Sequence, residues 1–214
     1  MREAYDVERP APGDRPWVGL CMVTSLDGSI AVDGTSGTLG NSNDLDVLLT
    51  LRDLADVLIV GAATARGEGY GPPRRPGQRI GVVTDRGNVD LDSELFSSGA
   101  GFVIANERTA VDDTRVDVLR AGRERVDIVE ALTRLDEIVP GVRYVQAEGG
   151  ATLNASLLDA DLIDELDLTL SPHLVGGTGP RLTVGASESM HRFVLAHLLA
   201  DDEGFVFSRW LRAC

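Results

Sequence analysis

A strand, a glycine turn and a helix follow one another directly in the segment around Glu148. An apolar run from 142 to 145 leads into Glu148-Gly149-Gly150, and an amphipathic segment begins at Ala151. Paired glycines at such a junction let backbone N–H groups approach a ligand closely, and the helix N-terminus behind them favours an anion. A glutamate beside an anion-binding site is electrostatically unfavourable, so its presence there indicates a functional role. The segment therefore predicts an α/β unit with a ligand at its turn.

The rest of the chain repeats this alternation and predicts a mainly parallel sheet with helices on both faces. Two strand-like segments at the C-terminus, 192–199 and 204–211, are joined by a short acidic turn and predict an antiparallel hairpin. Residues 1–15 are polar and predict a flexible arm, so that residues 16–214 form one domain. Expected strands are 17–24, 57–60, 79–84, 101–105, 125–129, 142–146 and 165–170, and expected helices are 43–55, 92–97, 114–121, 130–138 and 151–159.

The composition excludes several classes of function. The net charge is −14, which argues against nucleic acid or an anionic membrane as partner. All 20 basic residues are arginine, so lysine chemistry is excluded. Two cysteines and three histidines, widely spaced, indicate neither a disulfide framework nor a metal site. No apolar run is long enough to span a bilayer and the N-terminus has no secretory pattern, so a cytoplasmic protein is expected.

Two further turns follow predicted strands. Val60-Gly61 leads to Thr64 within a tight connection, and Thr84 and Arg86 follow the strand at 79–84. Each turn alone is more typical of an ordinary strand-to-helix connection, for Gly61, or of an exposed turn, for Thr84 and Arg86. Ligands of open α/β sheets bind at the carboxyl ends of the strands, so the three turns together predict one extended ligand. Neither G-x-G-x-x-G nor G-x-x-x-x-G-K-[ST] is present, which disfavours a plain Rossmann or P-loop site.

A fourth motif, Ser25-Leu26-Asp27-Gly28, comes directly after the first predicted strand. A hydroxyl and a carboxylate at a strand end can orient a polar substrate, and Asp27 could carry a proton. The alternative is a simple Asp-Gly turn. The leucine-rich helix at 43–55 is interpreted as core packing.

In order along the chain, four stretches together resemble the pyrimidine reductase of riboflavin biosynthesis. They are Ser25–Gly28, Val60–Thr64, Glu148–Leu153 with Asp164-Glu165, and Val175–Gly177. The resemblance covers residues 16 to 211 and implies a fold similar to dihydrofolate reductase. The separate zinc deaminase domain of the bifunctional relatives is absent from these residues.

The resemblance implies NADPH as cofactor and hydride transfer to the ribose C1′ of a phosphoribosylamino-pyrimidine, giving the ribitylamino form. Gly61 and Thr64 would line the cofactor, and Thr84 and Arg86 would lie near its 2′-phosphate. The pyrophosphate would be held at the helix N-terminus by Gly149, Gly150, Thr152 and Leu153.

On the substrate side, the resemblance assigns Ser25, Asp27 and Glu148 to face the sugar, and Glu68 to the place of a family aspartate. Asp27 and Glu148 would stabilise the developing positive charge, and one of them would relay the ring-opening proton. The candidates for the 5′-phosphate are Arg74 and Arg75, which could equally lie in a solvated loop, and Asn41 and Ser42.

Three departures from the family pattern concern substrate-facing positions. Cys21 stands where many members have lysine, Thr38–Gly40 replaces an aromatic segment, and Gly67–Gly71 replaces Asp-Asp-Pro. They leave open a reductase of the same fold acting on another substrate such as dihydrofolate, or a nucleotide-binding protein without turnover. The family also implies a homodimer.

Overall fold

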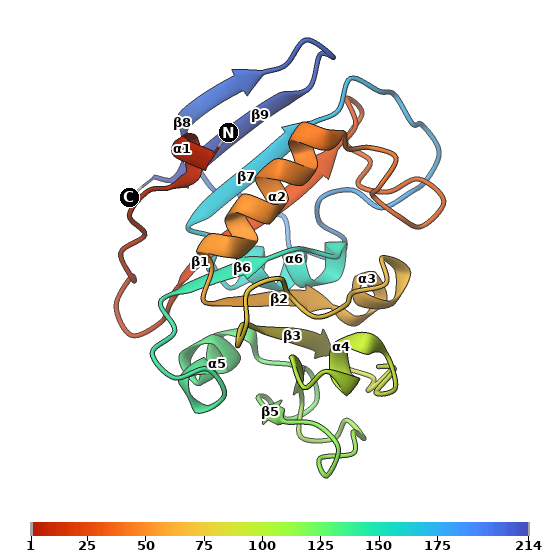
Figure 1. The fold of residues 1–214 in the computed structure, drawn as a ribbon, viewed down its shortest axis with the longest axis vertical. Coiled ribbons are helices and arrows are strands. Elements are labelled where there is room, and N and C mark those ends of the chain that lie inside the picture. Colours follow the sequence, from red (N-terminus) through yellow and green to blue (C-terminus); the bar gives the residue numbers. More distant parts are fainter. Residues whose placement is uncertain (1, 214) are drawn as a thin grey trace.

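The structure is a computed structural model that describes residues 2–213 and contains a nine-stranded sheet (Figure 1). The strand order is β5-β4-β3-β2-β6-β1-β7-β9-β8. The strands are β1 (Trp17–Thr24), β2 (Val57–Gly61), β3 (Arg79–Thr84), β4 (Gly101–Ala105), β5 (Val118–Arg120), β6 (Tyr144–Ala147), β7 (Glu165–Leu170), β8 (Phe193–Ala200) and β9 (Val206–Arg212). The helices are α1 (Arg2–Tyr5), α2 (Ser42–Leu54), α3 (Ala62–Gly67), α4 (Glu94–Ser97), α5 (Ile128–Thr133), the 3-10 turn η1 (Leu135–Glu137) and α6 (Ala151–Asp159).

The strand pairing confirms the predicted mixed sheet. The pairs from β5 through β7 are parallel, whereas β9 pairs antiparallel with both β7 and β8. A parallel pair requires a crossover, which the helices supply, whereas the short turn between β8 and β9 permits the hairpin. The carboxyl ends of β1, β2, β3 and β6 consequently lie along one edge of the sheet.

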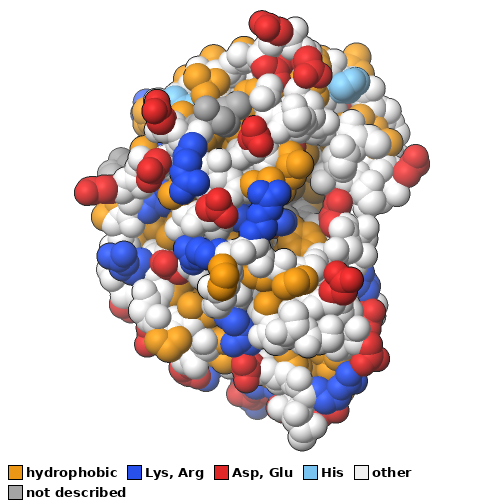
Figure 2. All heavy atoms as spheres, in the orientation of Figure 1, with side chains coloured by type: hydrophobic (Ala, Val, Ile, Leu, Met, Phe, Trp, Pro, Cys, Tyr) orange, Lys and Arg blue, Asp and Glu red, His pale blue; other side chains and the backbone are white. Residues whose placement is uncertain are grey.

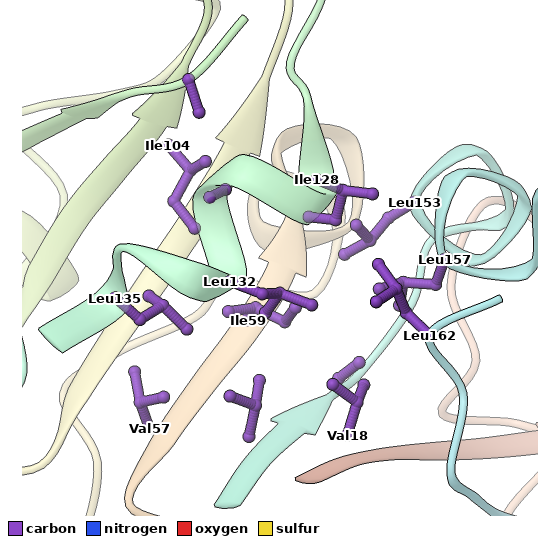
Figure 3. Close-up of a cluster of buried hydrophobic side chains, with 14 of the residues drawn as sticks. Val18, Val57, Ile59, Ile104, Ile128, Leu132, Leu135, Leu153, Leu157 and Leu162 are labelled. Carbon is purple, nitrogen blue, oxygen red and sulfur yellow. The ribbon is translucent and has the colours of Figure 1, made fainter. Parts of the chain in front are cut away.

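Both faces of β2, near the centre of the sheet, are covered, and its side chains alternate between two hydrophobic clusters. Val57 and Ile59 of β2 join the cluster under α5 and α6, whereas Leu58 and Val60 join the one beside α3 and α4. Figure 3 shows the first cluster, in which Leu132 of α5 lies close to Ile59 above the strands. The near-continuous apolar run of β2 is explained by this two-sided burial.

Two predicted elements near residue 120 are wrong. The segment expected to be helical at 114–121 contains the edge strand β5, and the strand expected at 125–129 overlaps the start of α5. β-Branched residues favoured the strand, but Asp127 caps the helix by accepting hydrogen bonds from the N–H groups of Val129 and Glu130. The acidic cap followed three residues later by Glu130 is the sequence signal that was overlooked.

Residues 2–15 differ from the expected flexible arm, because two arginines in this segment form ion pairs with buried carboxylates. Tyr5 is buried against α2 and β9, in a cluster with Leu51 and Phe207. Arg9 donates two hydrogen bonds, of 2.9 and 2.8 Å, to the fully buried carboxylate of Glu165. Arg15 pairs with Asp164 in the same way at 2.6 and 2.9 Å. The segment is therefore attached to the domain at Tyr5, Arg9 and Arg15, whereas residues 6–8 and 10–14 between these contacts are exposed.

The surface carries charges of both signs. On the face shown in Figure 2, arginine side chains are interspersed with acidic ones. Among residues 2–213, no helix is long and apolar enough to cross a bilayer. In the same residues, no group of three His, Cys, Asp or Glu side chains is placed to hold a metal ion.

Candidate active site

A cleft of about 860 Å³ opens at the carboxyl ends of β1, β2, β3 and β6. It is bounded by α2, α3 and the N-terminus of α6, and the three turns predicted to converge all reach it. The predicted residues that line it are Gly61, Thr64, Glu68, Thr84, Arg86, Glu148, Gly150, Thr152 and Leu153. The convergence follows from the parallel pairing, which places successive strand ends at the same edge.

The glycine turn packs closely against Thr64 of α3 and Met22 of β1, which leaves no room for a side chain at Gly150 or Gly149. The N–H of Gly61 donates to the carbonyl of Gly149 at 2.7 Å, and the N–H of Gly150 donates to Thr64 Oγ1 at 3.0 Å. A Cβ at Gly150 would lie 2.6 Å from that same Oγ1. Gly149 has a φ of 78°, a conformation that side chains disfavour, and its Cβ would lie 2.9 Å from Met22 Sδ. The turn therefore brings the backbone of Gly150 to the cleft, whereas Gly149 is not among the lining residues.

The N-terminus of α6 opens into the cleft behind this turn. Within the part of the chain that the structure describes, no side chain caps this helix at Gly150. Its first residues, Ala151 and Thr152, line the cleft. Uncapped N–H groups at the positive end of a helix are suited to an anion such as a pyrophosphate.

The turn after β3 supplies cationic side chains. Thr84 Oγ1 accepts hydrogen bonds from the N–H groups of Arg86 and Gly87, at 3.2 and 3.1 Å, so this hydroxyl orders the turn. The side chains of Arg86 and of Arg66 from α3 are exposed and line the cleft. An anionic group can therefore be met by two guanidinium groups here.

Glu148 is buried at the inner wall, where two neighbours hold its carboxylate. Arg52 donates from Nε to Oε1 at 2.7 Å and from Nη2 to Oε2 at 2.6 Å. The hydroxyl of Tyr70 donates to Oε2 at 2.6 Å. Burial raises the pKa of Tyr70 well above its ordinary value, and the charge of Glu148 adds to the effect. Burial lowers the pKa of Arg52, but the hydrogen bond and charge of Glu148 outweigh it and raise it overall.

The interpretation of α2 as core packing misses half of the helix. Val47 and Leu51 are buried in the core, but Asp44, Leu48 and Arg52 line the cleft. The spacing of four residues places these three on one face. The polar residues at 44 and 52, four residues on either side of Leu48, are the signal that predicts a second, functional face. Tyr70 has no comparable signal, since it lies in a glycine-rich loop.

Asp27 and Ser25 are not among the residues that line the cleft. The Asp27 carboxylate accepts hydrogen bonds from Ser25 Oγ at 2.6 Å and from the N–H groups of Val175 and Gly176 at 3.1 and 2.8 Å. These three bonds, that of Ser25 first, hold the pKa of Asp27 below its ordinary value. The Asp27 carboxylate thus binds the loop at 171–190. This geometry favours a structural role for Asp27, which holds the loop in place, over the expected catalytic role.

The four residues expected at the substrate phosphate also lie outside the cleft lining. Asn41 caps α2, and its amide donates to Asp201 at 2.9 Å, while Ser42 is the first residue of the helix. Arg75 donates to the carbonyls of Asp53 and Ala55, and Arg74 is exposed. Of these four side chains, Asn41 and Arg75 thus bind backbone groups of α2 and of its C-terminal end.

Comparisons with known proteins agree with this geometry. Residues 16–207 match the sequence model of the family described as the RibD C-terminal domain. The 2,5-diamino-6-ribosylamino-4(3H)-pyrimidinone 5′-phosphate reductase of Methanothermobacter thermautotrophicus is 31% identical over 186 residues, which span 79% of this chain and 84% of the relative.

Solved structures extend the likeness to the whole fold. A pyrimidine reductase-like protein from Corynebacterium diphtheriae superposes with a TM-score of 0.81 at 26% identity, covering 93% of this chain and 92% of the other. Dihydrofolate reductase from Enterococcus faecalis, at 16% identity and a TM-score of 0.56, covers 92% of this chain and 97% of its own. The sheet is therefore of the dihydrofolate-reductase type.

Proposed function

The chain belongs to the RibD C-terminal domain family, and on that premise we propose that it is an NADPH-dependent reductase of a ribosylaminopyrimidine 5′-phosphate. The observation that carries the proposal is the pairing, in one cleft, of a glycine turn at an uncapped helix N-terminus with a buried glutamate beside it. The first part suits the phosphates of an extended cofactor. The second provides a fixed carboxylate for the reacting sugar.

The residues of the cleft fit a nicotinamide dinucleotide phosphate. Backbone groups of Gly149 and Gly150, with Thr152 and Leu153, would hold the pyrophosphate, and Gly61 and Thr64 would lie beside it. Thr84 and Arg86 would meet the 2′-phosphate. When bound, the cofactor would supply the hydride.

Glu148 would act on the sugar through one particular oxygen. Oε2 accepts hydrogen bonds from both Arg52 and Tyr70, whereas Oε1 accepts from Arg52 Nε. A carboxylate oxygen has two acceptor sites, so Oε1 retains one for substrate. There it would accept the proton of the glycosylamine nitrogen and pass it to the ring oxygen as the ribose opens, so that protons balance, and its charge would favour the positive charge that develops at C1′. Arg52 and Tyr70 would keep the carboxylate in place.

Loss of NADPH absorbance on mixing protein, cofactor and the ribosylaminopyrimidine phosphate would test the proposal. Turnover of this substrate but not of dihydrofolate is the expected result. Turnover of dihydrofolate alone would assign the chain to the other activity of the shared fold. Cofactor binding without turnover of either would indicate a nucleotide-binding protein.

Arg86→Ala is expected to raise the dissociation constant for NADPH by about 10-fold, because a hydrogen bond to a charged group contributes about 1.5 kcal/mol or more. Affinity for NADH, which lacks the 2′-phosphate, should not change. Fluorescence titration with both nucleotides measures the effect, and Arg123→Ala, an exposed arginine outside the cleft lining, is the matched control. An equal loss for both nucleotides would place the 2′-phosphate elsewhere.

We also propose that a second copy of the chain covers β8. This edge strand exposes apolar side chains that a monomer would leave in water, namely Val194, Leu195, Leu198 and Leu199. Sedimentation velocity should give the mass of a dimer, and Leu198→Glu should shift it to that of a monomer. A monomeric wild-type protein would overturn this assignment.

A further inference from the structure

The cleft-facing side of α2 carries Asp44, Leu48 and Arg52, at intervals of four residues. With a rise of 1.5 Å per residue, the backbone positions of Asp44 and Arg52 lie about 12 Å apart along the helix. Arg52 is committed to Glu148 through two hydrogen bonds. The site of chemistry therefore lies at one end of this side of the helix, and Asp44 lies at the other.

Asp44 is fixed at that end by its surroundings. Its N–H donates to the capping side chain of Asn41 at 3.1 Å, so the first turn of α2 is set. A Cβ at Gly40 would overlap the Asp44 carboxylate, so the glycine makes room for it. Burial raises the pKa of Asp44, an effect that the Thr169 hydroxyl opposes. A half-buried carboxylate that lines the cleft can accept hydrogen bonds from a group that enters it.

An ionised carboxylate accepts hydrogen bonds and donates none, and its two oxygens match two adjacent N–H groups. A 2-amino-4-oxopyrimidine presents such an edge, through N3–H and the 2-amino group. The 2-oxo analogue presents N3–H beside a carbonyl oxygen, which would face a carboxylate oxygen. One of the two hydrogen bonds would then be replaced by repulsion between acceptors.

We propose that Asp44 is the specificity-determining residue that selects a 2-amino pyrimidine ring over its 2-oxo counterpart. The inference rests on the proposed function, since it places the pyrimidine at Asp44 and the sugar near Glu148. Leu48, between the two, supplies the apolar contact for the ring. The selected class is a 2-amino-4-oxopyrimidine carrying a ribosylamino group with a 5′-phosphate.

The test compares the 2-amino and 2-oxo substrates with the wild-type chain and two variants. Wild-type kcat/KM should favour the 2-amino substrate by about 100-fold or more, because the wrong edge leaves buried polar groups unpaired. Asp44→Asn presents one acceptor and one donor, which matches the 2-oxo edge, so the preference should vanish or invert, chiefly through KM. The control Asp46→Asn changes an exposed carboxylate of the same helix and should keep the wild-type preference.

A binding measurement separates this inference from the proposed function. Isocytosine and uracil carry the two edges without the sugar, and their NMR signals should show that the wild-type chain binds isocytosine more tightly. The difference should be lost in Asp44→Asn. If neither the 2-amino nor the 2-oxo substrate is reduced but the preference for isocytosine and its loss in Asp44→Asn are observed, the proposed function is wrong. The role of Asp44 in selecting the base would then still be supported. Equal binding of both bases, binding of neither at millimolar concentration, or an unchanged preference in Asp44→Asn would overturn it.

Discussion

Glu148→Gln is expected to lower kcat by about 100-fold or more, the usual contribution of a positioned acid or base. Glutamine preserves the shape of the side chain but removes the charge that would face the sugar and the site that would hold its proton. The affinity for NADPH should stay within about twofold of wild type, because the backbone of the glycine turn would carry the pyrophosphate. Steady-state kinetics and a fluorescence titration of the cofactor measure the two effects separately.

The control for this change is Glu203→Gln, which neutralises an exposed glutamate in the turn between β8 and β9. Its kinetics should match those of the wild-type chain. A Glu148→Gln variant with full turnover would contradict the role of this carboxylate in the reaction. Lost cofactor affinity together with lost turnover would indicate that Glu148 supports the nucleotide site.

Arg52→Leu is expected to destabilise the fold by about 3–5 kcal/mol, because it leaves the carboxylate of Glu148 buried without its cationic partner. The Glu148 side chain is 3% exposed and would lose two of its hydrogen bonds. Urea unfolding followed by circular dichroism gives the free energy of unfolding. Arg108→Leu, at a solvent-exposed ion pair with Glu124, should change it little.

The double variant Arg52→Leu/Glu148→Gln distinguishes the cause of the loss. If the unpaired charge is responsible, neutralising Glu148 should recover much of the stability lost in Arg52→Leu, and the two changes will not be additive. Additive losses would mean that Arg52 stabilises the fold through its packing alone. Non-additive changes in the free energy of unfolding would show that Arg52 offsets the cost of burying the charge of Glu148 at the cleft wall.

The sheet and the glycine turn could be predicted from the sequence because their determinants are local. The apolar run of β2 and the turn at Gly149-Gly150 each depend on residues close in the chain. The parallel pairing then places the strand ends together without further information. The sequence therefore predicts a glycine turn at the carboxyl end of β6, and Gly150 of that turn lines the cleft.

Long-range partners account for most of what the sequence did not reveal. The carboxylate of Asp27 is bound by backbone N–H groups about 150 residues away in sequence, at Val175 and Gly176. An Asp-Gly turn after a strand gives no indication of such partners. The helix that carries Arg52 is interpreted as core packing because its leucines dominate the helical pattern, although Leu45 among them is 51% exposed.

The ion pairs of Arg9 and Arg15 bear on what constitutes the smallest folding unit. A chain beginning at Pro16 would contain every strand of the sheet and every residue that lines the cleft. It would nevertheless lack the guanidinium groups of Arg9 and Arg15, which pair with Glu165 and Asp164 at the start of β7. The match to the family begins at residue 16 and therefore leaves out the cationic partners of two buried carboxylates at the start of β7.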